Sequence, residues 1–188
     1  MRNYLLAIFL VICSASTISA QTTRLHRVRS KFFQATRSQK VLNEVSSILK
    51  EQDNSNAPVL MAYQGAIEAI GAKFVWSPYS KLQHLKRGMR LINRSLEDSP
   101  DDIEIRFLRF LVEHHIPAVA GIDTHLDQDK KFIMANLDQM ATANLEQEFA
   151  NNLLEFLGQT GRYSTIEIAQ IRGAVNGRHE LIRVARTK

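Results

Sequence analysis

The chain has 188 residues, of which 45% are hydrophobic and 23% are charged, and its formal net charge is +5. This composition is that of an ordinary globular domain and excludes a low-complexity or wholly disordered chain. A chain of this length buries roughly two-thirds of its surface on folding and needs neither a disulfide nor a metal to hold it together.

Residues 1–20 have the features of a secretory signal peptide with cleavage after Ala20. Arg2 supplies a positive charge, residues 5–13 form an unbroken apolar run, and small polar residues follow. The run is shorter than the roughly 20 apolar residues that span a membrane, although an uncleaved membrane anchor is the alternative. Cleavage removes Cys13, the only cysteine, which favours a bacterial envelope. We therefore expect an exported protein, periplasmic or secreted, with no transmembrane segment after cleavage.

Residues 21–37 carry Phe32 and Phe33 but show no clear helical period, so we expect a basic N-terminal arm outside the fold. The segment from Gln21 to Lys40 holds no acidic residue. Its basic residues are Arg24, Arg27, Arg29, Lys31, Arg37 and Lys40. Basic arms often bind nucleic acid, but export argues against that partner. The alternatives are an anionic membrane surface, an acidic protein face, and a solvated arm without a partner.

The remainder of the chain, residues 38–188, predicts a single all-helical (all-α) domain. Apolar residues recur at steps of three and four over about 38–52, 57–74, 81–97, 103–115, 124–140, 145–157 and 164–175. Short turns between these stretches make consecutive helices antiparallel neighbours. The expected fold is therefore a stack of antiparallel helical hairpins with about six to seven helices.

Several helix ends carry local signals. Ser99 is expected to cap the helix over 103–115, with Pro100 in its first turn. Two capping boxes are predicted further on, Thr124 with Asp127 and Ser164 with Glu167. The pair Asn176-Gly177 is expected to break the helix that Ser164 begins.

Two helices have faces that predict close packing. In the helix over 57–74, Gly65, Ala66, Ala69 and Ala72 are small enough to let another helix approach closely. The helix over 103–115 is apolar on two adjacent stripes, which predicts neighbours on two sides. The residues it leaves for water are Glu104, Arg106, Arg109 and Glu113.

The hairpin over 81–117 resembles a tetratricopeptide (TPR) repeat. The family's small, large, small and proline positions correspond to Gly88, Ile92, Ser95 and Pro100, and Asp101-Asp102 follows the proline as in the family. The resemblance covers roughly residues 58–117. It implies a right-handed array of helical pairs with a concave surface for peptides or partner proteins, and the chain looks similar to uncharacterised exported bacterial proteins of this kind.

The helix over 81–97 carries the best candidate binding face. Arg87, Arg90 and Arg94 are spaced to lie on one side of the helix, and Lys81 flanks them. Such a row can bind carboxylates or phosphates with bidentate geometry. The alternative is a solvated basic face that nearby acidic residues balance.

A second cluster offers possible metal ligands. His114 and His115 end one predicted helix, and His125 and Asp127 open the next. Imidazole and carboxylate groups suit zinc or iron, although the spacing matches no established ligand motif. The alternative is that these residues complement the helix dipoles.

Two apolar features have no assigned role. Tyr63, Trp76 and Tyr79 are expected in the core, with a pocket lining as the alternative. The connector Ile116–Ile122 is expected either under neighbouring helices or in a contact patch.

These patterns favour a non-enzymatic exported scaffold or adaptor that binds a protein or peptide partner, without a cofactor and without nucleic acid. No G-x-S-x-G motif or glycine-rich phosphate loop is present. The alternative is a small metal-dependent hydrolase or metal-binding protein that uses His114, His115 and His125. A third hypothesis is envelope association through the basic arm.

Overall fold

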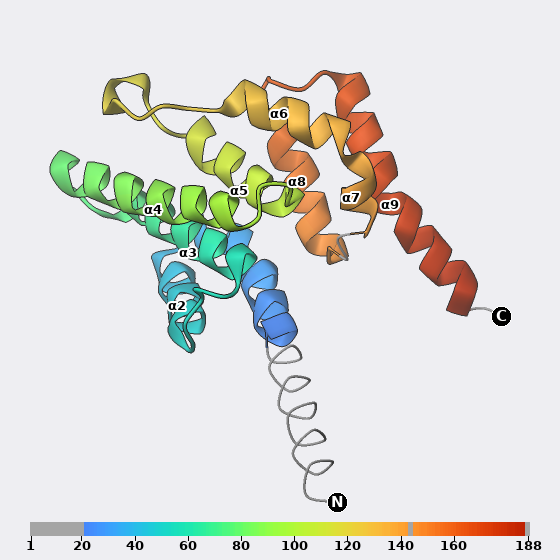
Figure 1. The fold of residues 1–188 in the computed structure, drawn as a ribbon, viewed down its shortest axis with the longest axis horizontal. Coiled ribbons are helices and arrows are strands. Elements are labelled where there is room, and N and C mark those ends of the chain that lie inside the picture. Colours follow the sequence, from blue (N-terminus) through green and yellow to red (C-terminus); the bar gives the residue numbers. More distant parts are fainter. Residues whose placement is uncertain (1–20, 143–144, 187–188) are drawn as a thin grey trace, which may run out of the picture.

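The computed structural model describes residues 21–142 and 145–186, with side chains described over 21–140 and 145–176. Over these residues the protein is all-helical, which confirms the predicted fold class (Figure 1). The elements are a helix over residues 21–35, α2 (Gln39–Lys50), α3 (Pro58–Ile70), η1 (Gly71–Phe74), α4 (Pro78–Asp98), α5 (Ile103–His114), η2 (Ala118–Ala120), α6 (Leu126–Ala135), α7 (Leu137–Thr142), α8 (Gln147–Gln159) and α9 (Thr165–Arg186). The expected signal peptide, residues 1–20, lies outside the described residues.

Residues 21–35 form a helix that packs into the core, so the expectation of an arm outside the fold is wrong here. Val28, Phe32 and Ala35 are fully buried. The Phe32 ring meets the Tyr63 ring edge-on, with 5.1 Å between the centroids. The three buried residues lie four and three positions apart, which is helical spacing. The stripe is narrow and lies among basic residues, so the local sequence did not reveal it.

The closest helix pair is α3 with α4, and glycine makes the approach possible. A Cβ atom added at Gly88 would lie 2.5 Å from the backbone oxygen of Gly65 and 2.7 Å from the Cβ of Ala69. The predicted small face of the helix over 57–74 is therefore confirmed. Ile92 and Ser95, on which the TPR resemblance also rests, are fully buried. Any closely packed helix pair has these properties, so the resemblance stays a prediction.

Helix α5 occupies the centre of the fold and contacts α3, α4 and α6 (Figure 1). Burial on two sides, predicted from its two apolar stripes, is confirmed because ten of its residues are buried. The expectation that its charged residues face water is wrong for Glu104, Arg109 and Glu113, which are all buried. Glu104 and Arg109 each form an ion pair with another element, and the Glu113 carboxylate accepts a hydrogen bond from the backbone N–H of His125. Such partners are what allow a charge to leave water.

Three helix boundaries differ from their predictions. Asp102, rather than Ser99, is the N-cap of α5, and its Oδ1 accepts hydrogen bonds from the backbone N–H groups of Glu104 and Ile105. The carboxylate lies directly before the first turn and opposes the positive end of the helix dipole, which makes it the stronger cap. Pro100 consequently lies in the turn, before the helix begins.

At α6 the capping box of Thr124 with Asp127 does not form, because His125 is the N-cap and makes no side-chain capping bond. The box of Ser164 with Glu167 does form, with hydrogen bonds of 2.7 and 3.3 Å. Helix α9 continues through the Asn176-Gly177 pair, so the predicted break is wrong.

Candidate ligand-binding groove

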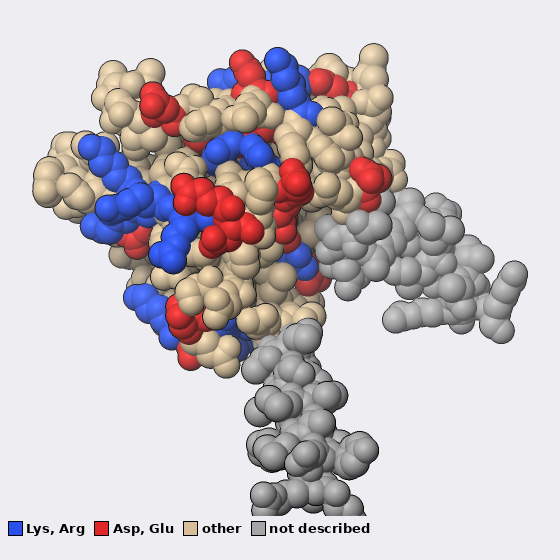
Figure 2. All heavy atoms as spheres, in the orientation of Figure 1, with Lys and Arg blue, Asp and Glu red and all other residues tan. Residues whose placement is uncertain are grey.

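The predicted basic face on α4 is divided by the structure. Arg87, Arg90 and Arg94 are exposed, and Figure 2 shows Lys and Arg side chains gathered over α4 with acidic side chains beside them. Arg87 is already paired, since its Nε lies 2.6 Å from the Oε1 of Glu68. Lys81 does not lie with the arginines but lines a groove on another side of α4. The four residues therefore do not form one binding face.

The residues of the metal hypothesis do not converge. The Nδ1 of His125 lies 3.0 Å from a carboxylate oxygen of the buried Glu113. His114 and His115 instead pack around the ring of Phe156. The Asp127 side chain is 88% exposed. Within the described part of the chain, no group of three or more His, Cys, Asp or Glu side chains is arranged to hold a metal ion.

His114 is nevertheless in an unusual environment. Its Nδ1 is buried without a hydrogen-bond partner, and its ring stacks on Phe110. Burial, followed by the electrostatic effect of the neighbouring His115 and Arg162, lowers its pKa below the ordinary value of 6.5. The neutral form is therefore favoured in the folded protein.

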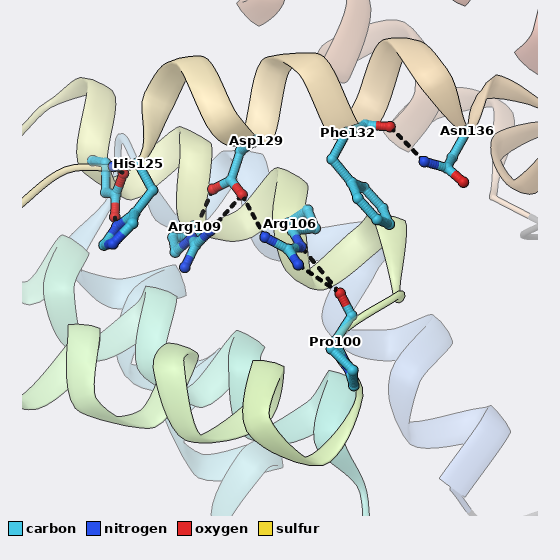
Figure 3. A network of polar contacts seen from close by, with 8 residues as sticks. Pro100, Arg106, Arg109, His125, Asp129, Phe132 and Asn136 are labelled. Atoms are coloured by element: carbon cyan, nitrogen blue, oxygen red, sulfur yellow. Dashed lines mark hydrogen bonds and ion pairs between the residues drawn. The ribbon is translucent and has the colours of Figure 1, made fainter.

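One buried ionic network joins α6 to α5 (Figure 3). Arg109 donates two hydrogen bonds to the fully buried Asp129, at 2.7 and 2.6 Å. Arg106 reaches the same carboxylate at 3.3 Å and also donates to the backbone oxygen of Pro100. The Arg106 guanidinium lies over the Phe132 ring, 4.7 Å from its centroid. Both carboxylate oxygen atoms of Asp129 thus accept hydrogen bonds from arginines of α5.

A second buried network centres on Glu104. Arg29, from the helix over 21–35, binds this carboxylate with two nitrogen atoms, and the Tyr63 hydroxyl donates to it at 2.6 Å. Burial, followed by the charge of Glu104, raises the pKa of Tyr63 well above its ordinary value, so the hydroxyl stays protonated as a donor. This network fastens the first described helix to α3 and α5.

An open groove of about 650 Å³ lies on the surface of the described structure. It is bounded by the end of the helix over 21–35, η1, α4, the C-terminal end of α5, η2 and α8. Its floor is apolar, and the main contributors are Phe33, Ile70, Leu82, Leu85, Leu111 and Phe156. The volume lies in the range of sites that bind small ligands or side-chain anchors.

Three exposed apolar residues either line this groove or are close in sequence to a residue that lines it. Pro78 lines it, and the residues on either side of Pro78 include Trp76, which is 98% exposed, and Tyr79, which is 72% exposed. Val119 of η2 also lines the groove and is 96% exposed. Neither Trp76 nor Tyr79 lies in the core as predicted, whereas Tyr63 does. An apolar groove that is open to solvent, with Val119 exposed in its lining, is typical of a binding surface.

The rim of the groove is mainly positive. Its charged side chains are Arg37, Lys73 and Lys81 against the single acid Glu155. The Nζ of Lys73 donates to a backbone oxygen at 2.7 Å. The side chains of Arg37 and Lys81 form no hydrogen bond or ion pair with another described residue. The rim therefore offers two cations without a carboxylate partner.

The sequence analysis identified Lys81 but missed the groove. One sequence signal for the groove was the apolar connector Ile116–Ile122. In the structure, Ile116 and Ile122 pack against the core, while Val119 is exposed and lines the groove. A second signal was the sequence from Trp76 to Tyr79, where two aromatic residues flank a helix start.

Comparison with known proteins gives no further guide to the site. Neither a protein-family model, nor a curated protein, nor a solved structure matches this chain. Within residues 21–142 and 145–186, no helix combines the length and the apolar character needed to cross a membrane.

Proposed function

We propose that the protein is a non-enzymatic helical scaffold that binds a peptide segment of a partner protein in this groove. The observation that carries the proposal is an apolar floor open to solvent, whose lining residue Pro78 is close in sequence to the exposed Trp76 and Tyr79. An exposed apolar surface of this kind has a free-energy cost in water that a bound partner removes. Aromatic side chains are also enriched among the residues that dominate binding energy at interfaces.

The buried ionisable residues support a scaffold role. Asp129 and Glu104 are each held by arginine side chains from a neighbouring element, and Glu113 is paired with His125. These contacts hold neighbouring elements together, which gives all three buried carboxylates a structural role. They lie apart from the groove, whose lining holds one carboxylate, Glu155.

Two further parts of the proposal rest on the sequence. The features of residues 1–20 support export to the periplasm or the outside of the cell, which predicts a mature chain beginning at Gln21. The TPR resemblance supports a peptide or protein ligand in a concave surface, which is compatible with the groove. Arg90 and Arg94 are proposed as a secondary contact for the same partner, because both are exposed on α4.

The test compares two leucines of α4. Leu82 lines the groove, whereas Leu91 lines a smaller hollow against α2 and α3 on another side of the helix. Both are half-buried and neither belongs to the main apolar core. We expect a partner that co-purifies stoichiometrically with the wild type and with Leu91→Glu but is lost with Leu82→Glu. Retention by Leu82→Glu, or no stoichiometric partner with any of the three proteins, would contradict the proposal.

A further inference from the structure

We infer that the groove takes an acidic amphipathic helix, with apolar side chains on one face and carboxylates along the edges of that face. This inference rests on the proposed function and specifies the chemistry of the partner. It has two supports, namely the helical construction of the groove walls and the charge of its rim.

The construction of the groove favours a helical ligand. A peptide that binds as an added β-strand gains its affinity from backbone hydrogen bonds to a sheet edge. The described residues form no strand, and the groove is bounded by helices and two short 3-10 turns. A helix satisfies its own backbone groups and can place side chains spaced by three and four residues into an apolar floor.

The charge of the rim specifies carboxylates at the edges of that helix. Lys81 and Arg37 are exposed, and no described residue supplies a carboxylate to either side chain. Lys73 uses one N–H group on a backbone oxygen and keeps two further donors. A row of acidic residues beside the apolar face would meet all three cations. Each exposed pair strengthens binding by about two- to fivefold at low salt.

Trp76 provides a direct reporter of occupancy. It is the only tryptophan of the chain and is 98% exposed, so its emission in the free protein is that of a solvated indole. It lies two residues before Pro78, which lines the groove. A helix seated in the groove is expected to cover Trp76 and shift its emission to shorter wavelength.

The probes are three synthetic helices of about five turns (~18 residues) that contain no tryptophan. All have the same leucine stripe, and the residues flanking the stripe are Glu in one, Gln in the second and Lys in the third. We expect the Glu helix to bind about 10- to 100-fold more tightly than the Gln helix at low salt, and the Lys helix to bind most weakly.

Two charge reversals on α4 locate the contact. Lys81→Glu should weaken the Glu helix by at least fivefold, because it removes one attraction and adds one repulsion, and it should not weaken the Lys helix. Lys86→Glu changes the same charge on the same helix outside the groove lining, and it is expected to leave all three affinities unchanged to within about twofold.

The outcomes separate this inference from the proposed function. Equal affinity for the Glu and Gln helices, with both lost in Leu82→Glu, would overturn the acidic chemistry and leave the peptide groove standing. If no helix shifts the emission, or if Leu82→Glu binds as tightly as wild type, both proposals fail. A shift produced instead by vesicles of phosphatidylcholine and phosphatidylglycerol in equal parts, and by none of the peptides, would assign the surface to membranes.

Discussion

The contact between Gly65 and Gly88 makes a sharp prediction about stability. Replacing Gly88 by alanine adds a Cβ atom 2.5 Å from the backbone oxygen of Gly65 and 2.8 Å from the backbone nitrogen of Ala69. Both atoms belong to helix α3, so no side chain can rotate away to relieve the clash. Since ordinary contact begins at 3.4 Å, α3 and α4 must separate by about 0.9 Å at this point.

The cost can be estimated from packing. A gap of 0.5 to 1 Å forfeits about a quarter to a half of each dispersion contact that it opens. Overpacking in well-packed interiors costs about 1 to 3 kcal/mol, and a clash with backbone belongs at the upper end. Alanine recovers about 1 kcal/mol over glycine inside a helix. The expected net destabilisation is therefore about 2 kcal/mol, which lowers Tm by about 4 to 8 °C in a chain of this size.

Gly173 provides the matched control. It lies inside helix α9, and a Cβ atom added there meets nothing within 4 Å. Gly173→Ala should therefore keep the gain in helix propensity and stabilise the protein by up to about 1 kcal/mol. Urea titration followed by circular dichroism measures both variants. The reasoning would be refuted if the Gly88→Ala protein were as stable as the wild type. It would also be refuted if Gly173→Ala lost more stability than Gly88→Ala.

Three other substitutions test the buried polar groups. Asp129→Asn leaves Arg109 buried without its carboxylate partner and should lower the free energy of unfolding, measured by urea titration, by about 3 to 5 kcal/mol. The control is Asp127→Asn, at a side chain that is 88% exposed, which should change the free energy of unfolding by less than about 0.5 kcal/mol. Tyr63→Phe removes a donor to a buried carboxylate and should cost about 1 to 3 kcal/mol by the same titration, so an unchanged midpoint would contradict the hydrogen bond. Because the pKa of His114 is lowered in the folded state, protonation favours unfolding: stability should be full above pH 6.5 and decline as the pH falls below it. His114→Phe should lose less stability than the wild type from about pH 7.5 to about pH 5, and an identical loss would remove His114 from the explanation.

The helices of the central hairpin could be predicted because their signals are local. In α4 and α5, apolar residues at helical spacing mark the buried stripes, and burial of Ile92 and Phe107 follows from their position in a stripe. The capping box of Ser164 and Glu167 is local as well, since its two residues lie three positions apart. Predictions failed where a boundary depended on competition between adjacent candidates, as for Asp102 at the start of α5.

The helix over 21–35 could not be predicted because distant residues stabilise it. Its Arg29 binds Glu104, which is 75 positions away in the sequence. Phe32 packs against Tyr63 and Phe149, which come from α3 and α8. A run of basic residues with a narrow apolar stripe is compatible with either a solvated arm or a packed helix. Only the tertiary partners decide between them.

The candidate site was only partly predictable for a related reason. The spacing of Arg87, Arg90 and Arg94 defines one side of α4, but it does not show that Glu68 already pairs with Arg87. Lys81 lies on a different side of that helix, and its place at the groove depends on α5, η2 and α8. A concave surface built from several separate elements has no local sequence signature.

The charged residues of α5 also explain where the groove lies. Glu104 binds Arg29 of the first described helix and Tyr63 of α3. Arg109 binds Asp129 of α6, and Glu113 contacts His125, the residue before α6. Buried pairs of this kind specify neighbours more than they add stability, because desolvation offsets much of their attraction. The C-terminal part of α5 carries Leu111, and His115 follows the helix; both line the groove together with residues of α8. Polar partners thus connect α5 to the helices around it, whereas its residues that line the groove, Leu111 and Val112, are apolar.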